Sequence, residues 1–136
     1  MATKATESNY KATIREASFE MTAKERVMYK DTQNAVSLND LATNAQKNDE
    51  KAVIENIKGY VILDIHNDKS EDVDYMNFVL VDNAGQKYVT GSQAFVNAFL
   101  DIYEEMKNET EPWGIEINML PSKNYKGKFV LTCSLI

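Results

Sequence analysis

The sequence predicts a mostly β-stranded domain with a single helix. From Val53 to His66, apolar and polar residues alternate with the period of two that a half-buried strand requires. One later stretch, from Phe95 to Met106, instead repeats its apolar residues at helical spacing. Turn-forming asparagine and glycine residues separate the remaining apolar runs. The 136 residues fit one domain of ordinary size.

The first predicted strand is long and carries an internal glycine. It runs for about 14 residues from Val53, whereas an average strand has about five or six. Gly59 lies inside it, and a glycine in a strand often marks a sharp bend or a bulge. A bend there would let this strand serve two sheets. Polar residues 67–74 follow it as a loop.

The middle of the chain predicts a hairpin followed by the helix. Tyr75–Val81 and Lys87–Thr90 are apolar enough for a second and a third strand, and residues 82–86 form the turn between them. The helix should run from Gln93 to Lys107. Ser92 precedes it as an N-cap, because its hydroxyl can accept a hydrogen bond from a free backbone N–H.

Two last strands, Trp113–Met119 and Lys128–Leu135, complete the pattern. The resulting order, β-β-β-α-β-β, is that of the OB-fold, a five-stranded Greek-key barrel, which we predict for residues 51–136. Another small β-barrel or an α+β meander is the alternative. A ferredoxin-like fold would need a helix between the first two strands, and residues 67–74 are too short and too acidic for one.

Residues 1–50 are predicted to form a polar, partly ordered N-terminal extension. Their apolar residues are few and weakly patterned, and residues 34–40 and 45–50 have the composition of loops. Scattered apolar residues between Ala12 and Lys30 are compatible with one added strand or short helix.

Charge is distributed unevenly along the chain. The formal net charge is −6, which by itself disfavours a polyanionic partner. Residues 1–51 are neutral, and residues 52–120 carry 4 basic against 13 acidic groups, a net charge of −9. Residues 121–136 carry 3 lysines and no acidic group. The C-terminal segment is therefore locally cationic within an acidic protein.

The residue inventory predicts a protein that is not an enzyme and that has no metal and no cofactor. The chain has one cysteine and one histidine, which are too few ligands for a zinc site. With one histidine, the sequence also indicates no hydrolytic triad. Cys133 lies in an apolar strand and reads as a buried hydrophobe, and His66 reads as a surface or loop-anchoring residue. No apolar run reaches about 18 residues, so we expect a cytoplasmic protein without a membrane span.

One loop has the composition of a binding site for single-stranded nucleic acid. The loop is Lys123-Asn124-Tyr125-Lys126-Gly127-Lys128, which interleaves cations for phosphates with an aromatic ring for base stacking. In an OB-fold it joins the fourth and fifth strands, and such loops grip oligonucleotides. The predicted nucleic-acid-binding residues are Lys123, Tyr125, Lys126 and Lys128 of this loop, with Lys58 and Tyr60 of the first strand and Tyr75, Lys87 and Tyr88 of the second and third.

Several short strings carry a family resemblance. They are Thr22-Ala23-Lys24-Glu25-Arg26, His66-Asn67-Asp68-Lys69-Ser70, Phe78-Val79-Leu80-Val81-Asp82, Tyr88-Val89-Thr90-Gly91-Ser92 and Ser122-Lys123-Asn124-Tyr125-Lys126-Gly127-Lys128. In these strings the chain resembles single-stranded DNA-binding proteins of tailed bacteriophages, loosely over residues 20–136 and better over 60–135. The resemblance implies an OB-fold that coats exposed single strands during phage DNA replication or recombination, in the host cytoplasm, with little sequence preference.

The resemblance also implies partners. Single-stranded DNA is the first, replication or recombination proteins are possible further ones, and a homo-oligomer is compatible with the family. The alternative function is a protein-binding OB or β-barrel module, a host-inhibiting or DNA-mimicking phage factor. The acidic segment 52–120 favours this alternative because its charge could dock on a basic partner.

Overall fold

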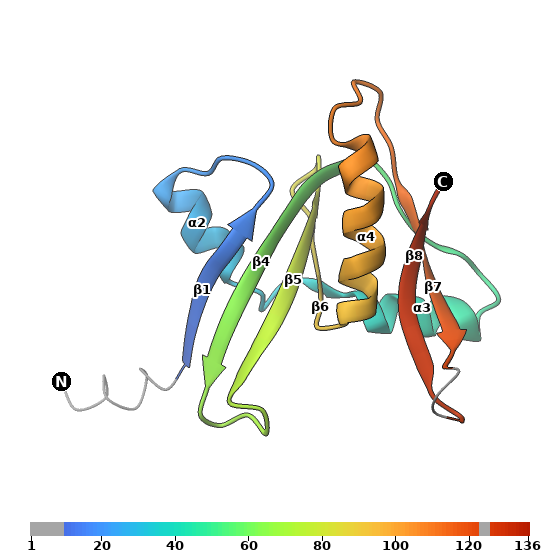
Figure 1. Cartoon of the computed structure of the whole chain (residues 1–136), viewed down its shortest axis with the longest axis horizontal. Helices are drawn as coiled ribbons and strands as arrows, with labels where there is room; N and C mark the ends of the chain where they lie inside the picture. Colours follow the sequence, from blue (N-terminus) through green and yellow to red (C-terminus); the bar gives the residue numbers. More distant parts are fainter. Residues whose placement is uncertain (1–9, 123–125) are drawn as a thin grey trace.

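Two β-sheets and three helices make up the described part of the chain, residues 10–122 and 126–136 of a computed structural model (Figure 1). The elements are β1 (Tyr10–Ala17), α2 (Ala23–Lys30), β2 (Val36–Ser37), α3 (Leu38–Lys47), β3 (Ala52–Ile54), β4 (Ile57–Asn67), β5 (Asp74–Asp82), β6 (Lys87–Thr90), α4 (Gln93–Met106), β7 (Ile115–Pro121) and β8 (Phe129–Leu135). The predicted mostly β architecture is confirmed, whereas the prediction of a single helix is wrong.

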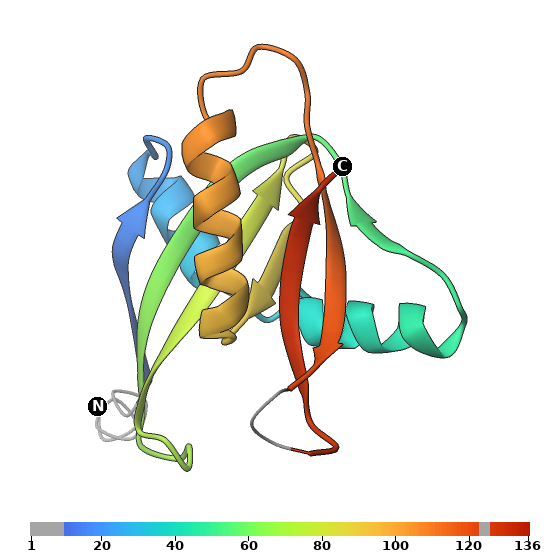
Figure 2. The ribbon, with the colours of Figure 1, turned by 45° about the vertical axis from the view of Figure 1, so that its right-hand side comes forward.

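In the described residues the strands form two separate sheets instead of the predicted five-stranded barrel. The larger sheet has the order β1-β4-β5-β6-β2 and the smaller one the order β3-β7-β8. Closure would need a strand pair on the far side of β6, but this side is occupied by β2 in the parallel register Val36↔Tyr88. Figures 1 and 2 show α4 between the two sheets, alongside β8. The helix therefore fills the space between the sheets.

The N-terminal region contributes more structure than the sequence indicated. Strand β1 pairs antiparallel with β4, and the side chains of Tyr29, Leu38 and Ala42 are buried. Helix α2 begins with a reciprocal capping box, in which the Thr22 hydroxyl accepts from the Glu25 N–H and the Glu25 carboxylate accepts from the Thr22 N–H. These elements hydrogen-bond to or pack against those of residues 51–136.

The long first strand does bend, but at a different residue from the predicted one. It is divided into β3, which pairs with β7, and β4, which pairs with β5. The break is at Asn56, whose φ of 55° is a left-handed conformation that asparagine tolerates better than most residues. Gly59 instead accompanies a β-bulge, and a Cβ at this position would lie 2.2 Å from the Ser18 Oγ. The predicted strand is thus two strands, one in each sheet.

Helix α4 matches its prediction and organises the larger core. The Ser92 hydroxyl accepts from the Phe95 N–H at 3.2 Å, which caps the first turn as expected. Phe95 and Phe99 are fully buried against Phe78 of β5. A second, smaller core lies on the opposite face of the larger sheet, where α2 inserts Tyr29 over Val61, Leu63, Ile65, Val79 and Val81.

Within the described residues, no helix has both the length and the apolar character needed to cross a membrane.

Candidate nucleic-acid interface

The two loops that the sequence assigns to nucleic-acid binding lie at one end of the molecule. Figures 1 and 2 show the β4–β5 connection, residues 68–73, and the described residues of the β7–β8 connection, 126–128, at the same lower end. We call this region the open end. β4 ends at this region, where the chain turns into β5. β8 begins there, after the turn from β7.

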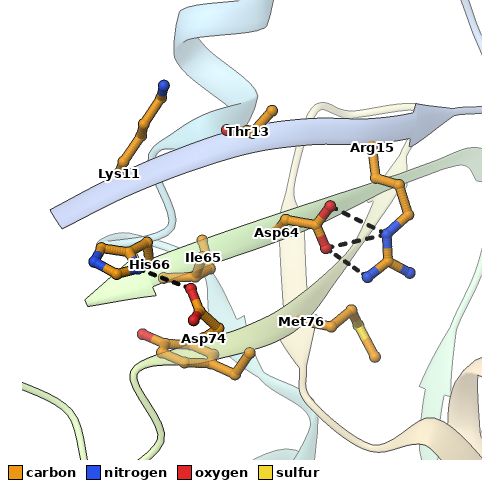
Figure 3. A pocket seen from close by; sticks show the side chains of 9 residues that line it. Lys11, Thr13, Arg15, Asp64, Ile65, His66, Asp74 and Met76 are labelled. Carbon is orange, nitrogen blue, oxygen red and sulfur yellow. Dashed lines mark hydrogen bonds and ion pairs between the residues drawn. The ribbon is translucent and has the colours of Figure 1, made fainter. Parts of the chain in front are cut away.

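The larger sheet presents a polar surface at the open end. Cross-strand register aligns Lys11 with His66 and Asp74 in one row, and Thr13 with Asp64 and Met76 in the next. These side chains line a hollow of about 490 Å³ (Figure 3). On the same face of β4, Tyr60 and Ile62 are buried in the larger core. Alternate residues of a strand share one face. This face of β4 is therefore apolar and buried at Tyr60 and Ile62, and polar and exposed at Asp64 and His66.

Arg15 and Asp64 face each other across the β1–β4 pair (Figure 3). The Arg15 Nε donates to both Asp64 carboxylate oxygens, at 3.0 and 3.2 Å, and an Nη donates to one of them. The Arg15 hydrogen bond lowers the pKa of Asp64 below its usual range. Both side chains are about half exposed, so the pair orders this surface and adds little stability.

His66 lies between two carboxylates at the turn end of β4. Its Nδ1 is 2.8 Å from an Asp74 oxygen, and its Nε2 is 2.8 Å from an Asp68 oxygen. Only the imidazolium form can donate from both nitrogens. The Asp74 hydrogen bond, with a further contribution from Asp68, raises the pKa of His66. The predicted loop-anchoring role of His66 matches these contacts, because it joins both ends of the β4–β5 connection.

We expect the His66 imidazole to titrate with a midpoint above about 6.5, the ordinary histidine value. A raised folded-state pKa gives stability that is complete below the unfolded value and is lost as pH rises through the folded value. NMR titration of the ring protons reports this directly, since the chain has 1 histidine. The Asp74→Asn variant should lower the midpoint, and Asp72→Asn, in the same connection, should leave it unchanged. A wild-type midpoint at or below 6.5 would contradict the ion-pair geometry.

The β7–β8 connection carries the exposed cations of the site. Lys126 and Lys128 are exposed, and the Ser122 N–H donates to the Lys128 carbonyl at 2.9 Å to close the connection. Gly127 there has a φ of 80°, which favours glycine. The two other predicted residues of this loop, Lys123 and Tyr125, lie outside the described residues.

Phe129 of β8 is 51% exposed. It is on the same face of β8 as the buried Leu131 and Cys133. The Ser92 hydroxyl donates to the Leu131 carbonyl at 3.5 Å, so α4 begins beside Leu131. Phe129, two residues closer to the open end, therefore extends beyond the cover of the helix. An exposed ring next to Lys128 is the kind of pair on which a base stacks and a phosphate binds.

The structure does not bring the remaining predicted residues into one groove. Lys87 pairs with Val81 and Tyr88 with Leu80, so these two neighbours lie on opposite faces of the larger sheet. Tyr75, paired with Ile65, shares the face of Lys87. Tyr88 therefore faces away from Tyr75 and Lys87, because adjacent strand residues point to opposite sides.

Lys87 and Tyr88 have partners within the fold. The Lys87 ammonium donates to the Met28 carbonyl at 2.8 Å and to the Asp31 carbonyl, where it completes the C-terminal end of α2. The Tyr88 hydroxyl donates to an Asp82 oxygen at 3.1 Å. Burial and this carboxylate raise the pKa of Tyr88 to about 12. Both side chains hold elements together.

Tyr60 and Lys58 are also structural. Tyr60 is 7% exposed, stacks on Phe78 at a centroid distance of 5.4 Å, and donates its O–H to the Glu16 carboxylate. Burial, together with Glu16, raises the pKa of Tyr60. The Lys58 ammonium lies 4.7 Å from the centroid of the Phe19 ring, a cation–π contact.

Sequence reasoning missed Lys11, Thr13 and Arg15 of β1, which face the open end. A signal was present, because these polar residues alternate with Ala12 and Ile14. The pattern spans only about five residues within a polar region, too few to separate a strand from a loop. Phe129 gave no such signal, because its exposure depends on where α4 begins.

The described residues do not offer a metal site or an activated thiol. No group of three or more His, Cys, Asp or Glu side chains in residues 10–122 and 126–136 could hold a metal ion. Burial raises the pKa of the Cys133 thiol to about 12, which keeps it protonated and unreactive near neutral pH.

Comparisons with known proteins give no relative: no family model, no curated protein and no solved structure matches this chain.

Proposed function

We propose that this chain binds single-stranded DNA with little sequence preference, without catalysing a reaction, at its open end. The observation that carries the proposal is the position of Phe129 next to Lys128, with Lys126 nearby, at the same end as the polar surface of β1, β4 and β5. An exposed ring preceded by two nearby lysines provides stacking and phosphate contacts without reading base edges.

The fold supports this proposal as a variant of the OB arrangement. Strands β4, β5 and β6 form an antiparallel meander, α4 follows the third of them, and β7 and β8 form the last hairpin. In this proposal β3 and β4 together correspond to the bent first strand of an OB-fold. The β4–β5 and β7–β8 connections then correspond to the two loops with which OB-folds grip oligonucleotides.

The acidic character of the chain is compatible with the proposal because the site is local. Lys126 and Lys128 lie in a segment with no acidic residue, although the whole chain carries a net charge of −6. The acidic body should weaken general attraction to polyanions, so binding should depend strongly on salt.

The test is fluorescence anisotropy of a labelled oligo-dT strand at several salt concentrations. The double variant Lys126→Ala/Lys128→Ala should bind more weakly and lower the salt slope by about 1.4, since each lost single-strand phosphate contact contributes about 0.7. A labelled strand is preferable to intrinsic fluorescence, because Trp113 is partly buried and stacks on Phe99.

The matched control is Lys24→Ala/Lys107→Ala. It removes two positive charges as well, one from α2 and one from the C-terminal end of α4, away from the open end. Its salt slope should equal that of the wild type. Absence of oligo-dT binding by the wild type at low salt would refute the proposal, as would equal slopes for the two double variants.

A further inference from the structure

A second hollow lies between β1 and α2, distinct from the one in Figure 3. Its volume is about 670 Å³, and residues from β1, α2 and the segment after α2 line it. Its apolar lining consists of Tyr10, Ala12 and Val27, and its cations are Lys11 and Lys30. We call it the β1–α2 groove. It lies on the face of the larger sheet that Tyr29 covers, and Lys11 lines both this groove and the hollow at the open end.

Two large apolar side chains that line this groove, one from β1 and one from α2, are exposed. Val27 of α2 is 67% exposed and Tyr10 of β1 47%, whereas Tyr29 is the buried residue of α2. A surface helix ordinarily turns polar residues outward. Clustered exposed apolar groups with a charged rim mark an interaction surface more often than an inert one.

The rim of the groove is cationic. Within residues 10–122 and 126–136, neither Lys11 nor Lys30 forms an ion pair. The Asp31 carboxylate, the acidic group of the lining, accepts the Gln33 N–H at 3.0 Å in a local turn. Lys24 and Arg26 add positive charge to the same helix. Two cations against one carboxylate in the lining favour an acidic ligand.

Strand β1 also offers a backbone edge beside the groove. It is the outermost strand of the larger sheet, and β4 is the only neighbour it has among the described residues. A bulge between Ile14 and Glu16 and the cation Lys11 would oppose pairing of this edge with a second copy of itself. The same cation would attract an acidic strand.

We propose that the β1–α2 groove binds an extended acidic segment of a partner protein, which adds as a strand to the edge of β1. An apolar side chain of that segment lies between Tyr10 and Val27, and flanking carboxylates meet Lys11 and Lys30. Strand addition supplies main-chain hydrogen bonds, and the groove selects alternate side chains. The free edge of β1 favours a peptide over nucleic acid, because only another strand can form main-chain hydrogen bonds with it.

The proposal is tested with an acetylated peptide of alternating glutamate and leucine, as long as β1 at 8 residues. A peptide with lysine in place of glutamate and a labelled oligo-dT strand serve as competing probes. The readouts are anisotropy and the backbone amide shifts of the ¹⁵N-labelled full chain. The acidic peptide should bind in preference to the basic one and should shift amides of residues 10–12 and 27–33.

The variants Val27→Glu and Lys30→Glu should each weaken peptide binding by at least about tenfold, because each places a carboxylate against the acidic ligand. Val53→Glu on β3 is the control, since Val53 is similarly exposed at 40% and lies outside the groove. All three variants should retain the oligo-dT affinity of the wild type, so this test is independent of the proposed DNA-binding site.

Three results would overturn the inference. One is equal binding of the acidic and basic peptides, and another is amide shifts that map away from the groove. The third is loss of oligo-dT affinity in Val27→Glu together with oligo-dT shifts in residues 27–33, which would make the groove a nucleic-acid site.

Discussion

Replacing Phe99 with alanine is expected to lower the free energy of unfolding by about 3–5 kcal/mol, the usual cost of removing a fully buried phenyl ring. Phe99 is 0% exposed, and its ring contacts those of Tyr60, Phe78, Phe95, Tyr103 and Trp113 at centroid distances of 5.5–6.2 Å. The substitution leaves a cavity where α4 meets the larger sheet. Urea unfolding followed by circular dichroism measures the loss.

Phe129→Ala is the matched control for this stability measurement. It makes the same chemical change at a ring that is 51% exposed, so the loss of stability should be below about 1 kcal/mol. Similar losses for the two variants would show that α4 does not hold the two sheets together through Phe99. A loss below 1 kcal/mol for Phe99→Ala would show the same.

In a DNA-binding experiment, Phe129→Ala should have the larger effect of the two variants, whereas Phe99→Ala has the larger effect on stability. Phe129→Ala is expected to weaken oligo-dT binding by about 1–3 kcal/mol, or about 5- to 150-fold, because one base loses its stacking surface. The ring lies next to Lys128 and beyond the first turn of α4, so a base can reach it without rearrangement of the fold. Anisotropy titration at one fixed salt concentration measures the change.

Two further variants separate stacking from loss of apolar area. Phe129→Trp should retain binding, since it keeps an aromatic face at the same position. Leu120→Ala removes an apolar side chain that is 53% exposed near the same end of β7, and it should leave the affinity unchanged. If Leu120→Ala and Phe129→Ala weaken binding equally, the ring does not act as a stacking platform.

The elements that the sequence predicted well have strong local patterns. The apolar stripe of α4 and the hydroxyl of Ser92 define a helix whose observed bounds differ from the predicted ones by one residue. The Lys87–Thr90 strand is observed as predicted, because the turn with Gly85 at a φ of 87° defines where it begins. Each of these features depends on residues a few positions apart.

The predictions that were wrong depended on contacts between distant residues. The bend of the first strand was expected at Gly59, but this residue accompanies a bulge beside Ser18, about 40 positions earlier in the chain. Lys87 and Tyr88 are both predicted binding residues, but as adjacent strand residues they face opposite sides of the sheet. The barrel did not close because β2, from the region predicted to be an extension, occupies the edge of β6.

By itself, the sequence determined the mostly β character, the place and length of α4, the hairpin turns and the local positive charge of residues 121–136. Periodicity, capping and turn chemistry act over a few residues, so they can be read from the chain directly. Only the tertiary structure decided which rings are covered, that β1 joins β4, and that Lys11, His66 and Asp74 form one row at the open end. Burial and register arise from pairing between residues far apart in the chain, and no local pattern specifies them.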